Sequence, residues 1–351
     1  MRPLPFVLGA AALLAVSAAA PAAPAAAAAP AAAAAPAAAG SSSSPSPFTI
    51  EDPRITESSG LAASRLHPGV YWTHNDSSDG PYVYAVDGRT GKTVARVTLR
   101  GIGSPRDVEA ISIGPDGNVY VGDIGDNLGG QWSHVWIYRF PEPKQLKDTT
   151  VTATQFTVQY QGGPRNAEAL MVHPRTGRVY IASKSDEDGG LYIGPATLSS
   201  SGVNVFRRVS DLDLEVTDGA FSPDGTRLVL RGYFSAAEYR WRNDKPTKLG
   251  EEPGLPLQRQ GESVTFTPDG GTLMYGTEGA GSKVTPVDLG GELLPDATAK
   301  EQKKKGEYSD RPDGKLSDDE KNGNLVKAGL TFAGALVVFY GLRRLFRRSR
   351  T

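Results

Sequence analysis

The amino-acid sequence predicts an all-β fold, most simply a β-propeller of five blades. Two observations lead to this prediction. A hairpin motif recurs five times along the central part of the chain, and each copy turns on a Pro-x-Gly-like signal such as GPDG, SPDG or TPDG. Short apolar strands flank each turn and further strands follow most copies, which suits a repeat of four antiparallel strands.

Each copy of the motif begins with an acid, runs through a short apolar strand, turns, and returns on a second apolar strand. The copies are ESSGLAASRLHPGVYWTHND (57–76), EAISIGPDGNVYVGDIGDN (109–127), EALMVHPRTGRVYIASKSD (168–186), DGAFSPDGTRLVLRGY (218–233) and ESVTFTPDGGTLMYGTEG (262–279). A β-sandwich is the rival fold, but its turns would not bring an acid back to the same strand start five times. A sixth blade could be assembled from 48–56 and 280–296, although these segments more simply form the strand exchange that closes a ring of five.

The N-terminal region reads as an export signal followed by a spacer. Residues 1–20 combine a basic start, an apolar run and small residues, which is typical of a secretory signal peptide. Residues 21–47 are almost entirely Ala, Pro and Ser, and this composition cannot bury a core, so we expect an extended disordered spacer. The propeller domain is expected over 48–296.

The C-terminal region predicts a membrane anchor. Residues 297–323 are rich in Lys, Glu, Asp and Gly and are expected to form a charged disordered stalk. The apolar run 324–342 is long enough for one transmembrane helix, and the tail 343–351 carries five arginines. Basic residues stay in the cytoplasm by the positive-inside rule, so we expect a single-pass protein of the cell membrane with an extracellular propeller.

Composition excludes several other classes. The chain has no cysteine, so an exported domain must be stable without disulfides. Its net charge of −1 provides no basic field for nucleic acid, and four histidines without paired spacing do not favour zinc. We expect a monomer whose partners are the membrane, through the C-terminal helix, and a small anionic substrate or a surface ligand.

Propeller geometry gives the leading acids a common location. The innermost strand of each blade lines the central channel, so the first residues of the five copies should form a ring at one end. Clustered carboxylates repel one another unless a cation or shared protons neutralise them, and calcium accepts many oxygen ligands. The predicted calcium ligands are Glu57, Ser58, Glu109, Glu168, Asp218 and Glu262. The alternative is that each acid caps its own blade by accepting backbone N–H bonds, without a metal.

The ends of the second strands should reach the same mouth of the channel. The predicted catalytic residues there are Asp123 and Glu278, as carboxylates that activate water. The predicted substrate-binding residues are Asn75, Asp76, Lys184 and Arg231. Lys184 and Arg231 stand at equivalent strand ends of neighbouring blades and could grip one anion together, or each could instead pair with a ring acid and hold the channel together.

The strings ESSGLAASRLHPGVYWTHNDSSDGPYVYAVD, RDVEAISIGPDGNVYVGDIGDN and RNAEALMVHP carry a family resemblance. They resemble the secreted phytase-like esterase family of WD-like propellers in actinobacteria, whose relatives include calcium-dependent propeller hydrolases. The resemblance implies calcium in the channel and hydrolysis of ester or phosphoester bonds. Because one fold serves many functions, a non-enzymatic propeller that binds a protein or glycan ligand remains the alternative.

Overall fold

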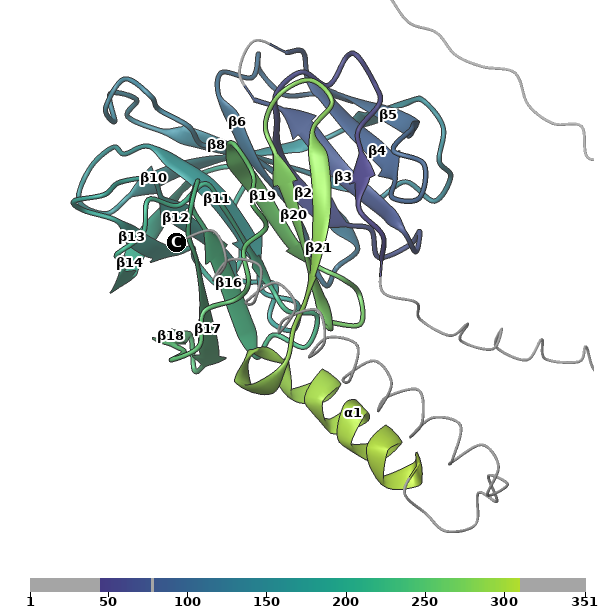
Figure 1. Ribbon diagram of the computed structural model, residues 1–351. Coiled ribbons are helices and arrows are strands. Elements are labelled where there is room, and N and C mark those ends of the chain that lie inside the picture. The colour runs from purple at the N-terminus through teal and green to yellow at the C-terminus, as the bar shows by residue number, and fades with distance from the viewer. Residues whose placement is uncertain (1–44, 77–78, 310–351) are drawn as a thin grey trace, which may run out of the picture. The chain divides into compact units, whose positions relative to one another are not determined.

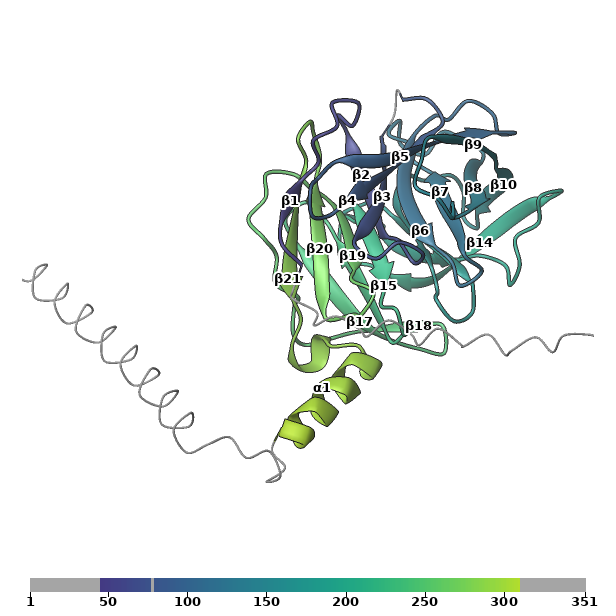
Figure 2. The ribbon, with the colours of Figure 1, turned by 90° about the vertical axis from the view of Figure 1, so that its right-hand side faces the viewer.

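The computed structural model describes residues 45–76 and 79–309, and within them it confirms an all-β propeller. The strands form five antiparallel units of four, which we call blades 1 to 5 in chain order (Figures 1 and 2). The predictions for the signal peptide, most of the spacer, the transmembrane helix and the basic tail lie outside the described residues. Among the described residues, no helix is both long and apolar enough to cross a membrane.

Each blade runs from an innermost strand at the channel to an outermost strand at the rim of the ring. Blade 1 contains β2 (Ser58–Ala63), β3 (Val70–Asn75), β4 (Tyr82–Asp87) and β5 (Thr93–Arg100). Blade 2 contains β6 (Val108–Ile113), β7 (Asn118–Asp123), β8 (Val135–Pro141) and β10 (Thr154–Tyr160). Blade 3 contains β11 (Ala167–Val172), β12 (Val179–Ser183), β13 (Gly190–Ile193) and β14 (Val203–Asp211). Blade 4 contains β15 (Asp218–Phe221), β16 (Arg227–Arg231), β17 (Ala236–Arg242) and β18 (Lys245–Lys248). Blade 5 contains β19 (Gly261–Phe266), β20 (Thr272–Thr277), β21 (Lys283–Asp288) and β1 (Phe48–Thr49).

The ring closes with five blades. Each inner strand packs against the inner strand of the next blade, and β19 of the last blade packs against β2 of the first. The N-terminal β1 completes blade 5 by pairing antiparallel with β21, with Phe48 opposite Val284. The ring is therefore closed by the predicted strand exchange, and the described residues do not form a separate sixth blade.

The hairpin turns explain why the motif recurs. Gly117, Gly225 and Gly270 adopt φ values of 71°, 70° and 72°, a left-handed conformation that glycine tolerates best. In the blade 4 turn, the Asp224 carboxylate accepts a hydrogen bond from the Thr226 backbone N–H at 2.9 Å. The aspartate and the glycine of each PDG signal thus stabilise the reversal between the first two strands. We call the end of the ring that carries these turns the turn face.

The hydrophobic core is divided among the contacts between blades. Five clusters of buried side chains each lie between two neighbouring blades. The cluster between blades 1 and 2, for example, contains Trp72, Val97, Ile111 and Phe140. Because each blade buries both of its faces, the ring gains stability without disulfides.

Two features of the outer strands were not predicted. The short strand β9 (Thr149–Thr152) adds to blade 1 by pairing parallel with β5. The outermost strands β10 and β14 also pair parallel, which joins blades 2 and 3 into one eight-stranded sheet. Both additions cover outer edges that would otherwise expose unpaired backbone groups.

The expected disordered stalk is wrong over its first part. After a short 3₁₀ helix, η1 (Gly291–Leu293), the chain forms helix α1 (Asp296–Ser309). The start of α1 is fixed to the turn face, because the Asp296 carboxylate pairs with Arg227 at 2.9 Å and the Ala297 N–H donates to the Asp224 carboxylate at 2.9 Å. Ala, Lys, Glu and Gln have high helix propensity, so a polar composition here gives a helix once its first turn is anchored.

Candidate functional site

The carboxylates predicted to converge lie at the end of the channel opposite the turn face, which we call the carboxylate mouth. Glu109, Glu168 and Glu262 each occupy a register shift at the start of an inner strand. In blade 2, for example, Val108 pairs with Asp123 and Ala110 pairs with Gly122, so Glu109 is the unpaired residue between them. Such a bulge takes a residue out of the ladder and redirects its side chain.

Three carboxylates from two blades form the tightest group. Asp76 follows β3, Asp107 directly precedes β6, and Glu109 lies in β6; oxygens of all three lie within 4.8 Å of one another. Asp107 and Glu109 are buried, with 5% and 2% of their surface exposed.

The electrostatics of this group oppose full ionisation. Burial, followed by the charge of Asp76, raises the pKa of Asp107 to about 7. Burial also raises the pKa of Glu109 well above its ordinary value, and the charges of Glu168, Asp76 and Asp107 add to this effect. Like charges in a desolvated place need either protons or a cation for stability.

One carboxylate oxygen of this group lacks a hydrogen-bond partner among the described residues. Glu109 Oε2 accepts a hydrogen bond from Ser59 Oγ at 3.2 Å, whereas Oε1 is buried and has no hydrogen-bond partner among the described residues. Gly125 closes one side of the group: a Cβ atom there would lie 2.4 Å from Asp107 Oδ2 and 2.7 Å from Glu109 Oε1. All three candidate ligands are carboxylate oxygens, which suit a hard divalent cation such as calcium.

The remaining ring acids have partners of other kinds. Glu168 accepts a hydrogen bond from Lys184 Nζ at 2.6 Å, and burial nevertheless raises the pKa of Glu168 to about 8. Asp218 accepts backbone N–H bonds from Gly219 at 2.7 Å and from Val264 at 2.8 Å, which is the capping role that the sequence left as the alternative. Burial raises the pKa of Glu262 to about 7, and its carboxylate accepts from the Gln260 amide at 3.2 Å.

The structure corrects the ring position in blade 1. Glu57 is exposed and precedes β2, and Ser58 Oγ lies 2.8 Å from Thr73 Oγ1 instead of facing the acids. The residue that occupies the place of Glu109 is Ser59, whose hydroxyl donates to Glu109. Ser58 pairs with Asn75 as Val108 pairs with Asp123, so the leading acid Glu57 lies two residues before the ring position of its blade.

Two strand-end residues accept hydrogen bonds from backbone N–H groups. Asp123 has no exposed surface, and its carboxylate accepts from the Asp107 backbone N–H at 2.9 Å and from Tyr138 OH at 2.5 Å. Asn75 has the corresponding role in blade 1, because its side-chain oxygen accepts from the Glu57 backbone N–H at 3.1 Å. Both side chains hold the segment that enters the inner strand, and the role of Asp123 as a general base and that of Asn75 as a substrate ligand stay predictions.

The predicted anion grip is also absent from the described mouth. Arg231 is completely buried and donates to the carbonyls of Ser263 at 2.9 Å and Gly276 at 3.0 Å, so it links blade 4 to blade 5. Burial lowers the pKa of Arg231 to about 10. Lys184 instead forms the ion pair with Glu168 that the sequence offered as the alternative, and its ammonium also lies 2.5 Å from Tyr233 OH.

Glu278, the other predicted catalytic carboxylate, lies at the rim of the mouth. It is half-buried, and its side chain accepts a hydrogen bond from the Gln260 amide. Burial, with the charges of Asp76 and Glu57, raises the pKa of Glu278. Glu278 therefore belongs to the same electrostatic group as the ring acids but lies outside the three-carboxylate cluster.

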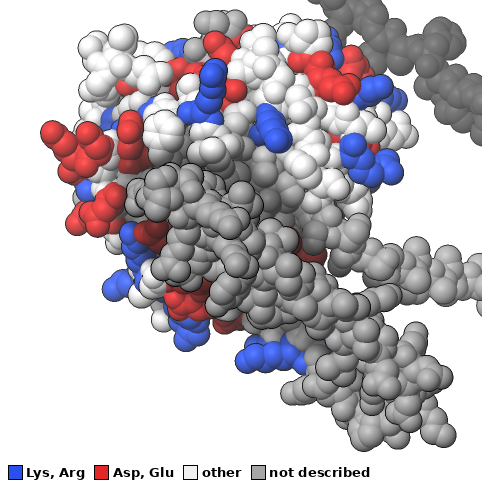
Figure 3. Space-filling model, viewed as in Figure 1, with Lys and Arg blue, Asp and Glu red and all other residues white. Residues whose placement is uncertain are grey.

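The predicted calcium ligands omitted Asp107 and also Asp76, which was expected to bind substrate. The spacing of Asp107 and Glu109 was the available signal, because residues two apart in a strand share a face. Gly125 had no such signal, since its role depends on the approach of its backbone to the side chains of a neighbouring strand. On the face shown in Figure 3, acidic and basic side chains of the described residues are interspersed. The acids Asp107, Glu109, Glu168 and Glu262 are buried.

Comparison with known proteins supports no family assignment. A scan of the sequence against protein-family models and a search of curated proteins find no match. Among solved structures, a chain in the crystal structure of a mitotic checkpoint complex matches at TM-score 0.37 and 14% identity, over 65% of this chain and 60% of that one. The structure of U3-55K matches at TM-score 0.36 and 13% identity, over 66% of this chain and 68% of that one. The fold assignment rests on the closed ring of five blades itself.

Proposed function

We propose that this protein is a calcium-binding β-propeller whose carboxylate mouth presents the ion to a ligand. Two observations support the proposal: carboxylate oxygens of Asp76, Asp107 and Glu109 lie within 4.8 Å of one another, and Glu109 Oε1 is buried without a hydrogen-bond partner among the described residues. A divalent cation would relieve the repulsion that raises the pKa of Asp107 and Glu109. It would also tie blade 1 to blade 2, since Asp76 follows a strand of the first and Glu109 belongs to the second.

The number of protein ligands favours an open coordination site. Calcium takes six to eight oxygens, and the cluster supplies three carboxylates. Water or the oxygens of a carboxylate, phosphate or sugar would complete the shell. When bound, the ion can also polarise a carbonyl or phosphoryl oxygen, and this is the chemistry that it would supply to a hydrolase.

Calcium binding is tested directly by titration calorimetry on the purified protein after treatment with chelator. We expect saturable calcium binding that Glu109→Gln weakens at least about tenfold, because the substitution removes one charged ligand. Glu187→Gln is the matched control, since Glu187 is an exposed acid of blade 3 outside the cluster. Absence of calcium binding by the unmodified protein would reject the proposal.

A hydrolase is the second candidate, and two ring acids favour it. The pKa of Glu168 is raised to about 8 and that of Glu262 to about 7, so both can exchange a proton near neutral pH. The resemblance to phytase-like esterases points to ester or phosphoester substrates. The pairing of Glu168 with Lys184 leaves Glu262 as the better general base, because its partner is a neutral amide.

Hydrolysis is tested by screening the full chain against phosphomonoesters, phosphodiesters, lactones and aryl esters, with calcium or with chelator. An enzyme of this kind should show calcium-dependent turnover that Glu262→Gln lowers by about 10²- to 10⁴-fold, the usual contribution of a general base. Calcium binding without turnover of any of these substrates would leave the non-enzymatic binding function.

We further propose that the propeller is displayed outside the cell on the C-terminal helix. The signal peptide, the apolar run 324–342 and the arginine tail support this location. The start of α1 is attached to the turn face, at the end of the channel opposite the carboxylate mouth. Protease added to intact cells should digest the propeller, and deletion of 324–351 should release the protein into the medium; protection of the propeller in intact cells would reject this topology.

A further inference from the structure

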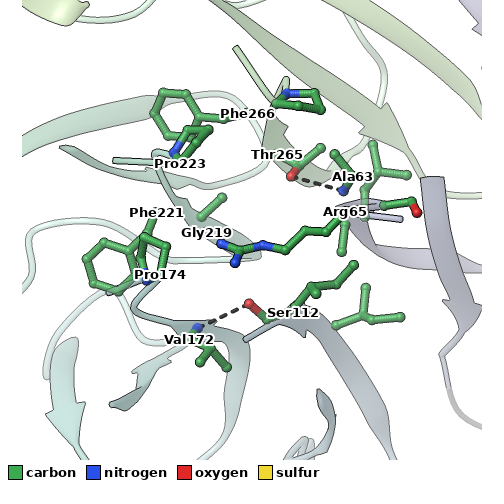
Figure 4. Close-up of a pocket in the computed structure, with 17 residues that line it drawn as sticks. Ala63, Arg65, Ser112, Val172, Pro174, Gly219, Phe221, Pro223, Thr265 and Phe266 are labelled. Atoms are coloured by element: carbon green, nitrogen blue, oxygen red, sulfur yellow. Dashed lines mark hydrogen bonds between the residues drawn. The ribbon is translucent and has the colours of Figure 1, made fainter. Parts of the chain in front are cut away.

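The turn-face end of the channel holds a second pocket, separate from the carboxylate mouth. Its cavity of about 330 Å³ is lined by residues from the ends of all five inner strands. This volume lies at the lower end of the range of small-molecule sites, which is roughly 300–1,000 Å³. We call it the turn-side pocket, and Figure 4 shows the 17 residues that line it.

Most of the residues that line the turn-side pocket are of apolar types. Phe221 and Phe266 line it together with three prolines, Pro174, Pro223 and Pro268, which belong to the hairpin turns of three successive blades. The polar side chains on the wall already have partners: the Val172 N–H donates to Ser112 Oγ at 3.1 Å, and the Ala63 N–H donates to Thr265 Oγ1 at 3.4 Å (Figure 4).

Arg65 is the single charged residue among those that line the pocket, and its side chain extends across the space between the walls (Figure 4). No carboxylate of the described residues lies within 4.0 Å of its guanidinium nitrogens, and no described acceptor hydrogen bonds to them. The nearest acids that influence it electrostatically are Glu142 and Asp116, and Glu142 accepts hydrogen bonds from Ser64 Oγ and Trp72 Nε1.

The Arg65 guanidinium has no ion-pair partner among the described residues and can therefore accept an anionic ligand. The pocket walls partly desolvate Arg65, and burial lowers its pKa. Its side chain is nevertheless accessible to solvent, so an entering molecule can reach it. One guanidinium matches one carboxylate through two parallel hydrogen bonds, whereas a phosphate dianion would need further donors or cations that the described lining does not provide.

We propose that the turn-side pocket binds a small organic carboxylate with an apolar body. The carboxylate pairs with the Arg65 guanidinium, and the apolar body packs against Phe221, Phe266 and the turn prolines. The site is independent of the carboxylate mouth, because the two lie at opposite ends of the inner strands and share no residue.

The test uses phenylacetate and 4-phenylbutyrate as probes, with 2-phenylethanol as a neutral analogue and phenyl phosphate as a competing anion. Binding to the full-length protein is measured by titration calorimetry. We expect saturable binding of the carboxylates, at least about tenfold weaker binding of the neutral analogue, and a loss of at least about tenfold in Arg65→Gln. Arg65→Lys should retain part of the affinity, since lysine keeps the charge but not the bidentate fork.

Arg175→Gln is the matched control, because Arg175 is an exposed arginine in the blade 3 turn that does not line the pocket. Arg175→Gln should bind the probes with the same affinity as the unmodified protein. Chelation of calcium should not change the affinity of the unmodified protein for the probes. Three results would overturn the proposal: no saturable binding of either carboxylate, equal binding by Arg65→Gln, or tighter binding of phenyl phosphate than of the carboxylates.

Discussion

The substitution Asp107→Asn gives the sharpest test of the carboxylate mouth, because it changes a charge without changing the size of the side chain. The folded-state pKa of Asp107 is raised to about 7 from an ordinary value of 3.8. An acid with a raised pKa holds its proton more tightly in the folded than in the unfolded state. In the absence of metal, the contribution of Asp107 to the free energy of unfolding is therefore fully present below about pH 4. It falls as the pH rises and is lost once the pH passes about 7.

The size of this loss follows from the pKa. A rise from 3.8 to about 7 corresponds to about 4 kcal/mol at 1.36 kcal/mol per pH unit. Solvent at the mouth screens the charge, so we expect about half of this, or about 2 kcal/mol. In chelator at pH 8, Asp107→Asn should raise the free energy of unfolding by that amount, and at pH 4 it should leave the free energy nearly unchanged.

The assay is urea unfolding followed by tryptophan fluorescence, since the chain has four tryptophans and Trp72 is completely buried. The measurements are repeated at pH 4, 6 and 8, with chelator and with calcium. In the unmodified protein, calcium at a hundredfold excess over its Kd should add about 2.7 kcal/mol at pH 8, and Asp107→Asn should lose most of this gain. Glu187→Gln should behave like the unmodified protein. A parallel pH dependence for Asp107→Asn and the unmodified protein in chelator would contradict this account of the mouth.

Three further substitutions test neighbouring groups of the channel. Gly125→Ala would place a Cβ 2.4 Å from Asp107 Oδ2, so calorimetry should find calcium affinity reduced at least about tenfold; unchanged affinity would show that Gly125 does not bound the site. Arg231→Met should lower the free energy of unfolding by about 3 kcal/mol, because buried carbonyls lose a charged donor, while calcium affinity measured on the folded protein stays the same. Lys184→Met leaves Glu168 without its counter-charge; urea unfolding should show a loss of about 1–3 kcal/mol at pH 8 and a smaller loss at pH 4, where the carboxyl is protonated in either protein.

The architecture of the blades could be predicted from local signals in the sequence. Strand alternation and the PDG turns are such signals, and each PDG turn is stabilised by its own aspartate and glycine. A single repeat cannot bury both of its faces, so five repeats pack side by side and close into a ring. The number of blades and the strand exchange through β1 could therefore be predicted as well. Local signals did not predict α1, since its first turn is fixed by Asp224 and Arg227, which lie about 70 residues earlier in the chain.

Which acids share a site depends on the tertiary structure. The sequence correctly brought Glu109, Glu168 and Glu262 to one mouth, because they begin equivalent strands. It misplaced Glu57, because the leading acid of blade 1 lies two residues before the ring position, and only the pairing of Ser58 with Asn75 shows this offset.

Nor could the sequence tell which charges already have partners. Arg231 hydrogen bonds to carbonyls of another blade, and Asp123 to the backbone N–H of Asp107 in its own blade. Whether a charged side chain is free for a ligand or holds the chain in place depends on groups within about 3 Å of it, and only the packing of the blades brings those groups together.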